Sequence, residues 1–237
     1  MRELTKPLGT KAYGHIPHLP GSRLGPGDHC CHDGQARICT EKVRDKHDVI
    51  IVTEKLDGSN VCVARIDGQC YALTRSGYLA MSSPYEQHQM FARWVYSNYE
   101  RFLAVLEDGE RLVGEWLAQA HGTRFELYHE PFVAFDLMKG KERLVTEDVI
   151  TRLELGEFIY PHIIHAGEPI SIKDAMAWLG AGFHGAIDPV EGAVWRVERC
   201  GKVDFLAKYV VPDKVDGRYL PEVSGKEAVW NWREDCE

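Results

Sequence analysis

The chain has 237 residues, of which 44% are hydrophobic and 27% are charged, and its formal net charge at pH 7 is −8. This length allows one large globular domain with a substantial core, with or without a small appendage. The acidic charge excludes a protein that coats nucleic acid non-specifically, because that function needs an excess of Lys and Arg, although a local basic groove remains compatible with it.

No apolar run in the sequence approaches the ~20 residues that a membrane-spanning helix needs. Residues 1–7 lack the apolar core of a signal peptide. The seven cysteines are an odd number and are spread over residues 30–236 without a compact framework, which favours reduced thiols over disulfides. We therefore expect a cytoplasmic protein with no membrane partner.

Residues 1–48 form a predicted N-terminal extension that is rich in Gly, Pro and His and packs on the main domain. Ser22 and Arg23 in this extension are candidates for a phosphate contact, and the alternative is a solvated turn. The His-Cys-Cys-His cluster at residues 29–32, together with Cys39, contains soft ligands for zinc. Because adjacent cysteines lack the usual two-residue spacer of a zinc site, we favour thiols in a Gly-rich loop.

Residues 49–210 form the predicted main domain, which begins as an antiparallel sheet. Two apolar runs of strand length, residues 49–52 and 61–66, flank a turn at Asp57-Gly58. A second turn, Asp67-Gly68, leads into a third strand. Apolar side chains between residues 84 and 106 recur at three- and four-residue steps, which predicts a helix whose aromatic residues face the core.

The second half of the main domain continues the mixture of strands and helices. Strands are expected at residues 111–118 and 128–138, helices at 146–156 and 171–179, and final strands at 192–197 and 203–209. Ser171 is the expected N-cap of the later helix. These elements predict the α+β class. Residues 211–237 are expected to form a short C-terminal extension, because we see no room for an OB domain.

Lys55 lies in the most informative segment, Thr53-Glu54-Lys55-Leu56-Asp57-Gly58-Ser59-Asn60. A lysine acts as a nucleophile only when it is neutral, so it must lie where burial or a neighbouring cation disfavours its charged form. Taken alone, this short segment is explained equally well by a surface lysine beside a hairpin turn. Other parts of the chain are needed to decide between the two interpretations.

Lys55-Leu56-Asp57-Gly58 resembles motif I of the covalent nucleotidyltransferases, the superfamily of ATP-dependent DNA ligases, RNA ligases and mRNA capping enzymes. Ser59-Asn60 is closer to the RNA-ligase form of this motif, in the RNA ligase 2-like branch, since DNA ligases and capping enzymes usually carry arginine at the second position. Segments that resemble the later motifs follow in the family's order. They are residues 73–77 (motif Ia), 112–116 (III), 132–137 (IIIa), 191–194 (IV) and 204–208 (V).

The resemblance implies an ATP-dependent RNA ligase with a ligase-type nucleotidyltransferase domain, in which antiparallel sheets are flanked by helices. Lys55 would attack the α-phosphate of ATP to form lysyl-AMP, and AMP would pass to an RNA 5′-phosphate that is joined to a 3′-hydroxyl. Lys208 would stabilise the α-phosphate charge, and Glu191 would bind Mg²⁺ or Mn²⁺. Asp57 would either orient Lys55 or support metal binding.

The resemblance also implies residues that bind the nucleotide. Glu54 would hold the adenosine, Arg75 and Glu115 would each bind a ribose hydroxyl, and Phe135 would stack on adenine. Asn60 would face the nucleic-acid end or the leaving group. Each residue, taken singly, is also explained as a surface charge or a core aromatic, so the ordered set carries the functional interpretation.

One position departs from the family pattern. Motif V in ligases usually presents two lysines separated by one residue, but the first position here is Leu206. Lys202 and Lys214 are candidate substitutes, and Arg23 is a candidate for holding the triphosphate. The rival functions are a minimal DNA-nick ligase, a non-catalytic nucleotide-binding module, and nucleotidyl transfer to a protein or small molecule. Without an OB domain, end specificity would come from the catalytic domain or from a protein partner.

Overall fold

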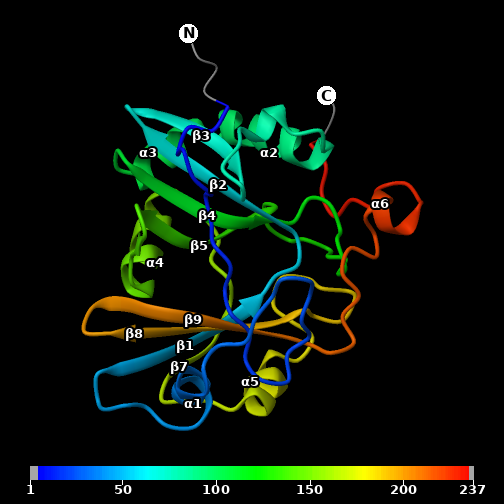
Figure 1. The fold of residues 1–237 in the computed structure, drawn as a ribbon. Helices are drawn as coiled ribbons and strands as arrows, with labels where there is room; N and C mark the ends of the chain where they lie inside the picture. The colour runs from blue at the N-terminus through cyan, green and yellow to red at the C-terminus, as the bar shows by residue number, and fades with distance from the viewer. Residues whose placement is uncertain (1–4, 235–237) are drawn as a thin grey trace.

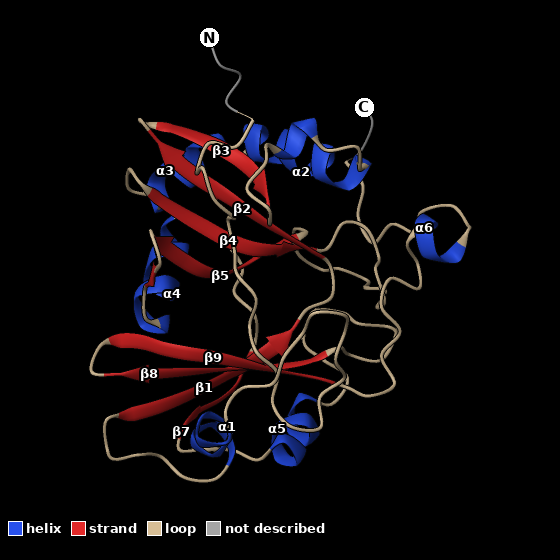
Figure 2. Cartoon of the chain, viewed as in Figure 1, coloured by secondary structure: helices blue, strands red, loops and turns tan. Residues whose placement is uncertain are grey.

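A computed structural model describes residues 5–234 of the chain (Figure 1). Two antiparallel sheets lie one above the other, with helices on their outer sides (Figure 2). One sheet has four strands in the order β7-β1-β8-β9, and the other has five in the order β3-β2-β4-β5-β6. This arrangement is the predicted α+β fold of antiparallel sheets flanked by helices.

The four-stranded sheet holds the strand that leads to Lys55. Its strands are β1 (Asp48–Lys55), β7 (Ile163–Gly167), β8 (Gly192–Arg199) and β9 (Lys202–Val210). The β-branched residues of β1 suit a buried central strand, and its side chains are buried from Ile50 to Glu54. Helices α1 (Asp33–Thr40) and α5 (Ile172–Leu179) cover the outer face, over a core that includes Trp195.

The five-stranded sheet packs on a core that is rich in aromatic side chains. Its strands are β2 (Ser59–Ile66), β3 (Gln69–Thr74), β4 (Glu110–Trp116), β5 (Phe132–Lys139) and β6 (Glu142–Arg143). The 3₁₀ helix η1 (Ala80–Ser82) and the helices α2 (Glu86–Ser97), α3 (Tyr99–Val105) and α4 (Thr146–Leu155) lie beside it. The ring centroids of Phe91 and Trp94 lie 5.7 and 5.6 Å from that of Phe132, which anchors α2 on the sheet.

Several elements differ from the sequence predictions. The helix predicted over residues 84–106 is two helices, because the Asn98 side chain donates to the carbonyl oxygen of Trp94 at 2.9 Å and ends α2. Cys39 lies in helix α1 rather than in a loop, and β7 was not predicted. The prediction for Ser171 is confirmed, because its Oγ accepts from the backbone N–H of Asp174 at 3.1 Å.

The N-terminal segment crosses from one sheet to the other (Figure 1). At the five-stranded sheet, the backbone N–H groups of Ala12 and Tyr13 donate to the carbonyl oxygen of Arg75. At the four-stranded sheet, the N–H of Leu19 donates to the carbonyl oxygen of Lys208 at 2.8 Å. The segment therefore contacts both sheets.

The C-terminal residues also pack on the main body of the protein. Helix α6 (Pro221–Ser224) follows β9, and Trp230 and Trp232 pack against the core of the five-stranded sheet. Six cysteines in residues 5–234 are free thiols. No helix within this described part is long and apolar enough to cross a membrane.

Candidate active site

A cavity of about 590 Å³ lies between the two sheets and is large enough for a nucleotide. Its walls come from both sheets and from the N-terminal segment. The structure brings all nine predicted site residues to this cavity, although they are spread over most of the chain. They are Glu54, Lys55, Asp57, Asn60, Arg75, Glu115, Phe135, Glu191 and Lys208.

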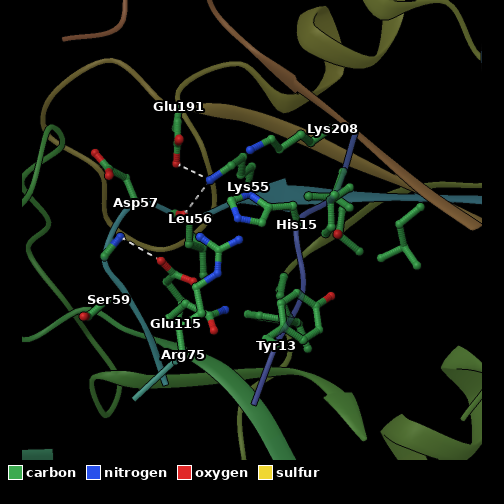
Figure 3. Close-up of a pocket in the computed structure, with 18 of the residues that line it drawn as sticks. Tyr13, His15, Lys55, Leu56, Asp57, Ser59, Arg75, Glu115, Glu191 and Lys208 are labelled. Atoms are coloured by element: carbon green, nitrogen blue, oxygen red, sulfur yellow. Dashed lines mark hydrogen bonds and ion pairs between the residues drawn. The ribbon is translucent and has the colours of Figure 1, made fainter. Parts of the chain in front are cut away.

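Lys55 is the last residue of β1 and points into the cavity toward Glu191 (Figure 3). Its Nζ lies 2.6 Å from Oε2 of Glu191. The register of the sheet explains this contact, because Lys55 pairs with Gly192 and Glu191 immediately precedes that residue. Gly192 has a φ of +154°, and a Cβ there would lie 1.9 Å from the carbonyl oxygen of Tyr209, so only glycine fits at the start of β8.

The electrostatic surroundings of Lys55 differ from the prediction. Burial alone would lower the pKa of Lys55, but the carboxylates of Glu191 and Glu115 outweigh burial and raise it above its usual value. The prediction that the site lowers this pKa is therefore wrong for the protein's own side chains. A further positive charge near Glu191 is needed before Lys55 becomes a good nucleophile.

Polar groups of the five-stranded sheet face Lys55 from the other side of the cavity. Asn60 and Glu115 are cross-strand neighbours on β2 and β4. Oε1 of Glu115 accepts from the backbone N–H of Gly58 at 3.2 Å, and burial raises its pKa to about 7. The side-chain oxygen of Asn60 is buried and has no hydrogen-bond partner among the described residues, so it is available to a ligand.

Arg75 and Phe135 are held by the N-terminal segment. Nη2 of Arg75 donates to the carbonyl oxygen of Gly14 at 3.0 Å, and the ring of Phe135 packs edge-on against Tyr13 with centroids 5.5 Å apart. Glu54 is buried, and its side chain accepts from the backbone N–H of Phe183 at 2.8 Å. The carboxylate of Glu54 therefore fixes a loop beside the cavity.

Lys208 lies on β9, the edge strand next to β8. Burial, assisted by the nearby charge of Lys55, lowers the pKa of Lys208. Its Nζ lies 3.9 Å from Oδ1 of Asp28 in the N-terminal segment. Leu206, two residues earlier, also lines the cavity, so the position of the missing lysine faces the site with an apolar side chain.

The comparison with known families decides the interpretation of this arrangement. A family model described as RNA ligase matches residues 48–210, which is more than half of the chain. The chain belongs to the RNA ligase family.

Solved structures of RNA ligases share this fold. An archaeal ATP-dependent RNA ligase is 19% identical, with a TM-score of 0.53 over 84% of this chain and 48% of that one. A Naegleria gruberi RNA ligase mutant with ATP and Mn is 15% identical, with a TM-score of 0.55 over 82% of this chain and 59% of that one. The same ligase with PPi is 17% identical, with a TM-score of 0.55 over 89% and 62% of the two chains. The chain thus spans about half to three fifths of the length of these structures.

A curated sequence adds a short local match. An uncharacterized protein of Methanocaldococcus jannaschii is 53% identical over 32 residues, which is 14% of this chain and 8% of that protein. This match is too short to extend the family assignment.

The candidate substitutes for the missing motif-V lysine of this RNA ligase family member lie elsewhere. Lys202 pairs with Arg199 at the start of β9, at the opposite end of the strand from Lys208. Arg23 forms an ion pair with Asp216 and lines a smaller cavity of about 200 Å³ that shares Glu191 and Lys208 with the main one. Of the three candidates, only Arg23 lies beside Lys208.

Asp57 makes contacts that the sequence did not reveal. Its Oδ2 accepts from the backbone N–H of Gly122 at 2.8 Å and lies 2.5 Å from Nζ of Lys214. Nζ of Lys55 instead contacts Glu191 and the carbonyl oxygen of Leu56. Lys214 is thus a partner of Asp57 and does not take the place of a motif-V lysine in the cavity.

The donor set fits a hard divalent cation that is completed by substrate. Glu191 and Glu115 present carboxylate oxygens to the cavity beside Lys55. Within residues 5–234, no three His, Cys, Asp or Glu side chains form a ready-made metal cluster, and this includes the cysteines and histidines near residue 30. Mg²⁺ and Mn²⁺ are commonly bound by one or two carboxylates together with phosphate oxygens, and this site supplies the carboxylates.

Sequence reasoning missed several residues that line the cavity. Tyr13 donates from its hydroxyl to Oδ2 of Asp136 at 2.7 Å, and Nη1 of Arg196 binds Oδ1 of the same carboxylate at 2.8 Å. These contacts join the N-terminal segment to both sheets behind the cavity. Arg196 could have been identified from the sequence, because side chains alternate along a strand and Arg196 therefore lies on the same face of β8 as Val194.

Proposed function

We propose that this protein is an ATP-dependent RNA ligase that acts through a lysyl-AMP intermediate. It transfers AMP to the 5′-phosphate of an RNA end and joins that end to a 3′-hydroxyl. The observation that carries this proposal is the convergence of nine predicted motif residues on one cavity around Lys55, in a chain of the RNA ligase family.

In the first step, Nζ of Lys55 attacks the α-phosphorus of ATP. The ammonium group of Lys55 first loses one proton to solvent; a P–N bond then forms, the P–O bond to the β-phosphate breaks, pyrophosphate leaves, and a second proton is lost from the nitrogen. Lys208 stabilises the charge that develops on the α-phosphate, because its ammonium group faces the same cavity. A divalent cation bound by Glu191, Mg²⁺ or Mn²⁺, would neutralise phosphate charge and weaken the hold of Glu191 on Lys55.

In the second step, an oxygen of the RNA 5′-phosphate attacks the phosphorus of lysyl-AMP, and the P–N bond breaks to regenerate Lys55. In the third step, the RNA 3′-hydroxyl attacks that 5′-phosphate and AMP leaves. The side-chain oxygen of Asn60, which has no hydrogen-bond partner in the described part of the chain, would accept a hydrogen bond from a sugar hydroxyl or a bound water in these steps. Both steps are mainly a matter of positioning.

The adenosine would lie along the five-stranded sheet and the N-terminal segment. Phe135 offers an aromatic ring for adenine, and Arg75 and Glu115 offer a donor and an acceptor for the two ribose hydroxyls. Glu54 contributes by fixing Phe183 and the backbone beside the nucleotide. We place the enzyme in the cytoplasm, where its free thiols would remain reduced, and a protein partner would supply additional end specificity.

A nucleotide-binding module without turnover is the second candidate, and Leu206 favours it because one phosphate-binding lysine is missing. ATP would then raise the melting temperature without forming an adduct. A minimal DNA-nick ligase would instead form the adduct and prefer an all-DNA nick.

The test incubates the purified chain with α-labelled ATP and Mg²⁺, followed by a denaturing gel. We expect a labelled protein that is lost in Lys55→Ala, that is released by acid and stable to base, and that does not form with α-labelled GTP. Ligation is then compared on nicked duplexes with RNA or DNA 3′-hydroxyl strands. ATP binding without an adduct would favour the nucleotide-binding module over the ligase. Preference for an all-DNA nick would favour the DNA ligase over the RNA ligase.

A further inference from the structure

A buried lysine from the segment after β9 contacts Asp57, one of the residues that line the cavity. The side chain of Lys214 is only 4% exposed, and its Nζ lies 2.5 Å from Oδ2 of Asp57. Nζ also donates to Oγ1 of Thr123. A buried ammonium group needs such partners because an unpaired charge in the interior is strongly unfavourable. Lys214 is therefore committed to Asp57 and Thr123.

The loop that contains Gly122 closes around the same pair. The backbone N–H of Gly122 donates to Oδ2 of Asp57 at 2.8 Å. A Cβ at Gly122 would lie 2.6 Å from the carbonyl oxygen of Val215 and 2.8 Å from Cε of Lys214. Only glycine permits this close approach between the loop and the C-terminal segment.

The C-terminal segment after β9 also forms backbone hydrogen bonds with Glu191 and His121. The backbone N–H of Val211 donates to the carbonyl oxygen of Glu191 at 2.9 Å, and that of Tyr219 donates to the carbonyl oxygen of His121 at 2.8 Å. Lys214 lies between these two attachment points. Its ammonium group is therefore held in place from both sides, as a group that positions another residue must be.

The contacts of Asp57 are made through one oxygen. Gly122 and Lys214 both bind Oδ2, which leaves Oδ1 for the cavity that Asp57 lines. Asp57 follows Lys55 by two residues, and a carboxylate so close to the nucleophile is a natural competitor for its ammonium group. In the structure, Nζ of Lys55 is bound by Glu191 (Figure 3). The carboxylate of Asp57 is instead bound by Lys214.

We propose that Lys214 is a positioning residue for nucleotidyl transfer, which holds Asp57 so that Oδ1 faces the cavity and the carboxylate does not bind Lys55. This inference rests on the proposed function, because it concerns the same site. With Lys214, the set of residues that act in the site would extend beyond the segment that matches the family model, which ends at residue 210. Lys214 acts through Asp57 and does not itself line the main cavity.

The test is a double-mutant cycle on the rate of adduct formation with α-labelled ATP. The variants are Lys214→Met, Asp57→Asn and the double variant. The matched control is Lys202→Met, at an exposed lysine of β9. We expect Lys214→Met to slow adduct formation about 10–100-fold, as is typical when the partner of an active-site carboxylate is removed, and Lys202→Met to leave it unchanged. If Lys214 acts through Asp57, the double variant is no slower than Asp57→Asn.

A second readout separates positioning from phosphate binding. A positioning role lowers the maximal rate of adduct formation and leaves the KM for ATP nearly unchanged, whereas a lysine that contacts phosphate would raise the KM. Circular dichroism and thermal unfolding monitor the fold of each variant. If Lys214→Met does not fold, the double variant still serves, because it removes both buried charges together and is compared with Asp57→Asn.

The outcomes distinguish this inference from the proposed function. If the wild type forms no adduct, the proposed function fails and the role of Lys214 fails with it. Three results with a labelled wild type would leave the ligase intact and overturn the positioning role. The rate effects of the two substitutions could multiply, Lys214→Met could match the wild type, or only the KM for ATP could rise.

Discussion

The two sheets that enclose the cavity supply different kinds of groups. The four-stranded sheet presents charged side chains that interact with one another, namely Lys55, Glu191 and Lys208. The five-stranded sheet presents Glu115, which accepts a hydrogen bond from the backbone, and Asn60, whose side-chain oxygen has no hydrogen-bond partner within residues 5–234. Charges suit phosphate transfer, and fixed neutral or hydrogen-bonding groups suit recognition of sugar and base. The difference suggests that one sheet carries the chemistry and the other the recognition.

The largest expected effect tests the chemical side. Lys208→Met removes the cation that we propose for the α-phosphate, and adduct formation should fall on the order of 10²–10³-fold, as for other groups that stabilise developing charge. Single-turnover kinetics with labelled ATP measure it, with Lys202→Met as a control at the other end of β9. A rate within a few-fold of the wild type would remove Lys208 from the chemistry.

The next effect tests the recognition side. Glu115→Gln keeps the shape and the acceptor for the backbone N–H of Gly58 but would weaken the proposed hydrogen bond to a ribose hydroxyl. We expect the KM for ATP to rise about tenfold with a smaller change in maximal rate, because a hydrogen bond to a charged group contributes about 1.5–3 kcal/mol. A pure fall in maximal rate would place Glu115 with the chemical groups and would break the proposed division between the sheets.

Glu54, on the four-stranded sheet, is expected to make stability depend on pH. Burial raises the pKa of Glu54 to about 7, against an ordinary value of 4.5. Between these values the unfolded chain has released the proton that the folded protein keeps, so the free energy of unfolding contributed by Glu54 falls as pH rises from 4.5 to 7, by up to about 3 kcal/mol.

Denaturant titrations of the wild type and Glu54→Gln between pH 4.5 and 8 measure this effect. Glutamine retains an acceptor for the N–H of Phe183 but does not titrate. The difference in unfolding free energy between the two proteins should therefore grow in favour of the variant as pH rises. A difference that does not vary with pH would show that Glu54 ionises normally.

The smallest expected effect concerns the link between the sheets. Tyr13→Phe removes the hydroxyl that donates to the buried Asp136, which keeps its bonds to Arg143 and Arg196. We expect a loss of about 1–2 kcal/mol in the free energy of unfolding, because Asp136 remains partly satisfied. Unfolding at pH 7 measures it, and Tyr96→Phe, at an exposed tyrosine, is the control that should change nothing.

The sequence predicted the strands near Lys55 and the residues of the cavity because both depend on local patterns. The apolar run before Lys55 is contiguous in the chain, and the ordered motifs identify Glu115 and Glu191 without a structure. The expected turn at Asp57-Gly58 between two strands of one sheet is wrong, because β1 and β2 belong to different sheets and this segment connects them. The break at Asn98 was missed because apolar periodicity continues through it, and only the side-chain bond to Trp94 ends α2.

Contacts between distant residues were the part that could not be predicted. No local pattern pairs Asp57 with Lys214, and the sum of charges around Lys55 depends on the register of β1 and β8. For the protein's own side chains, the pKa of Lys55 was predicted in the wrong direction for the same reason, since the carboxylates near it come from β4 and from the residue before β8. Ion-pair geometry follows from tertiary structure and not from periodicity.

The path of the N-terminal segment has a consequence for how the protein is made. Ala12 and Tyr13 bind the backbone of Arg75, and Leu19 binds that of Lys208. During synthesis on the ribosome, residues 12–19 emerge before β9 and must therefore wait for this strand before they can take their place. One wall of the cavity is closed only after β9 has been translated, so a nascent chain without β9 lacks the finished cavity.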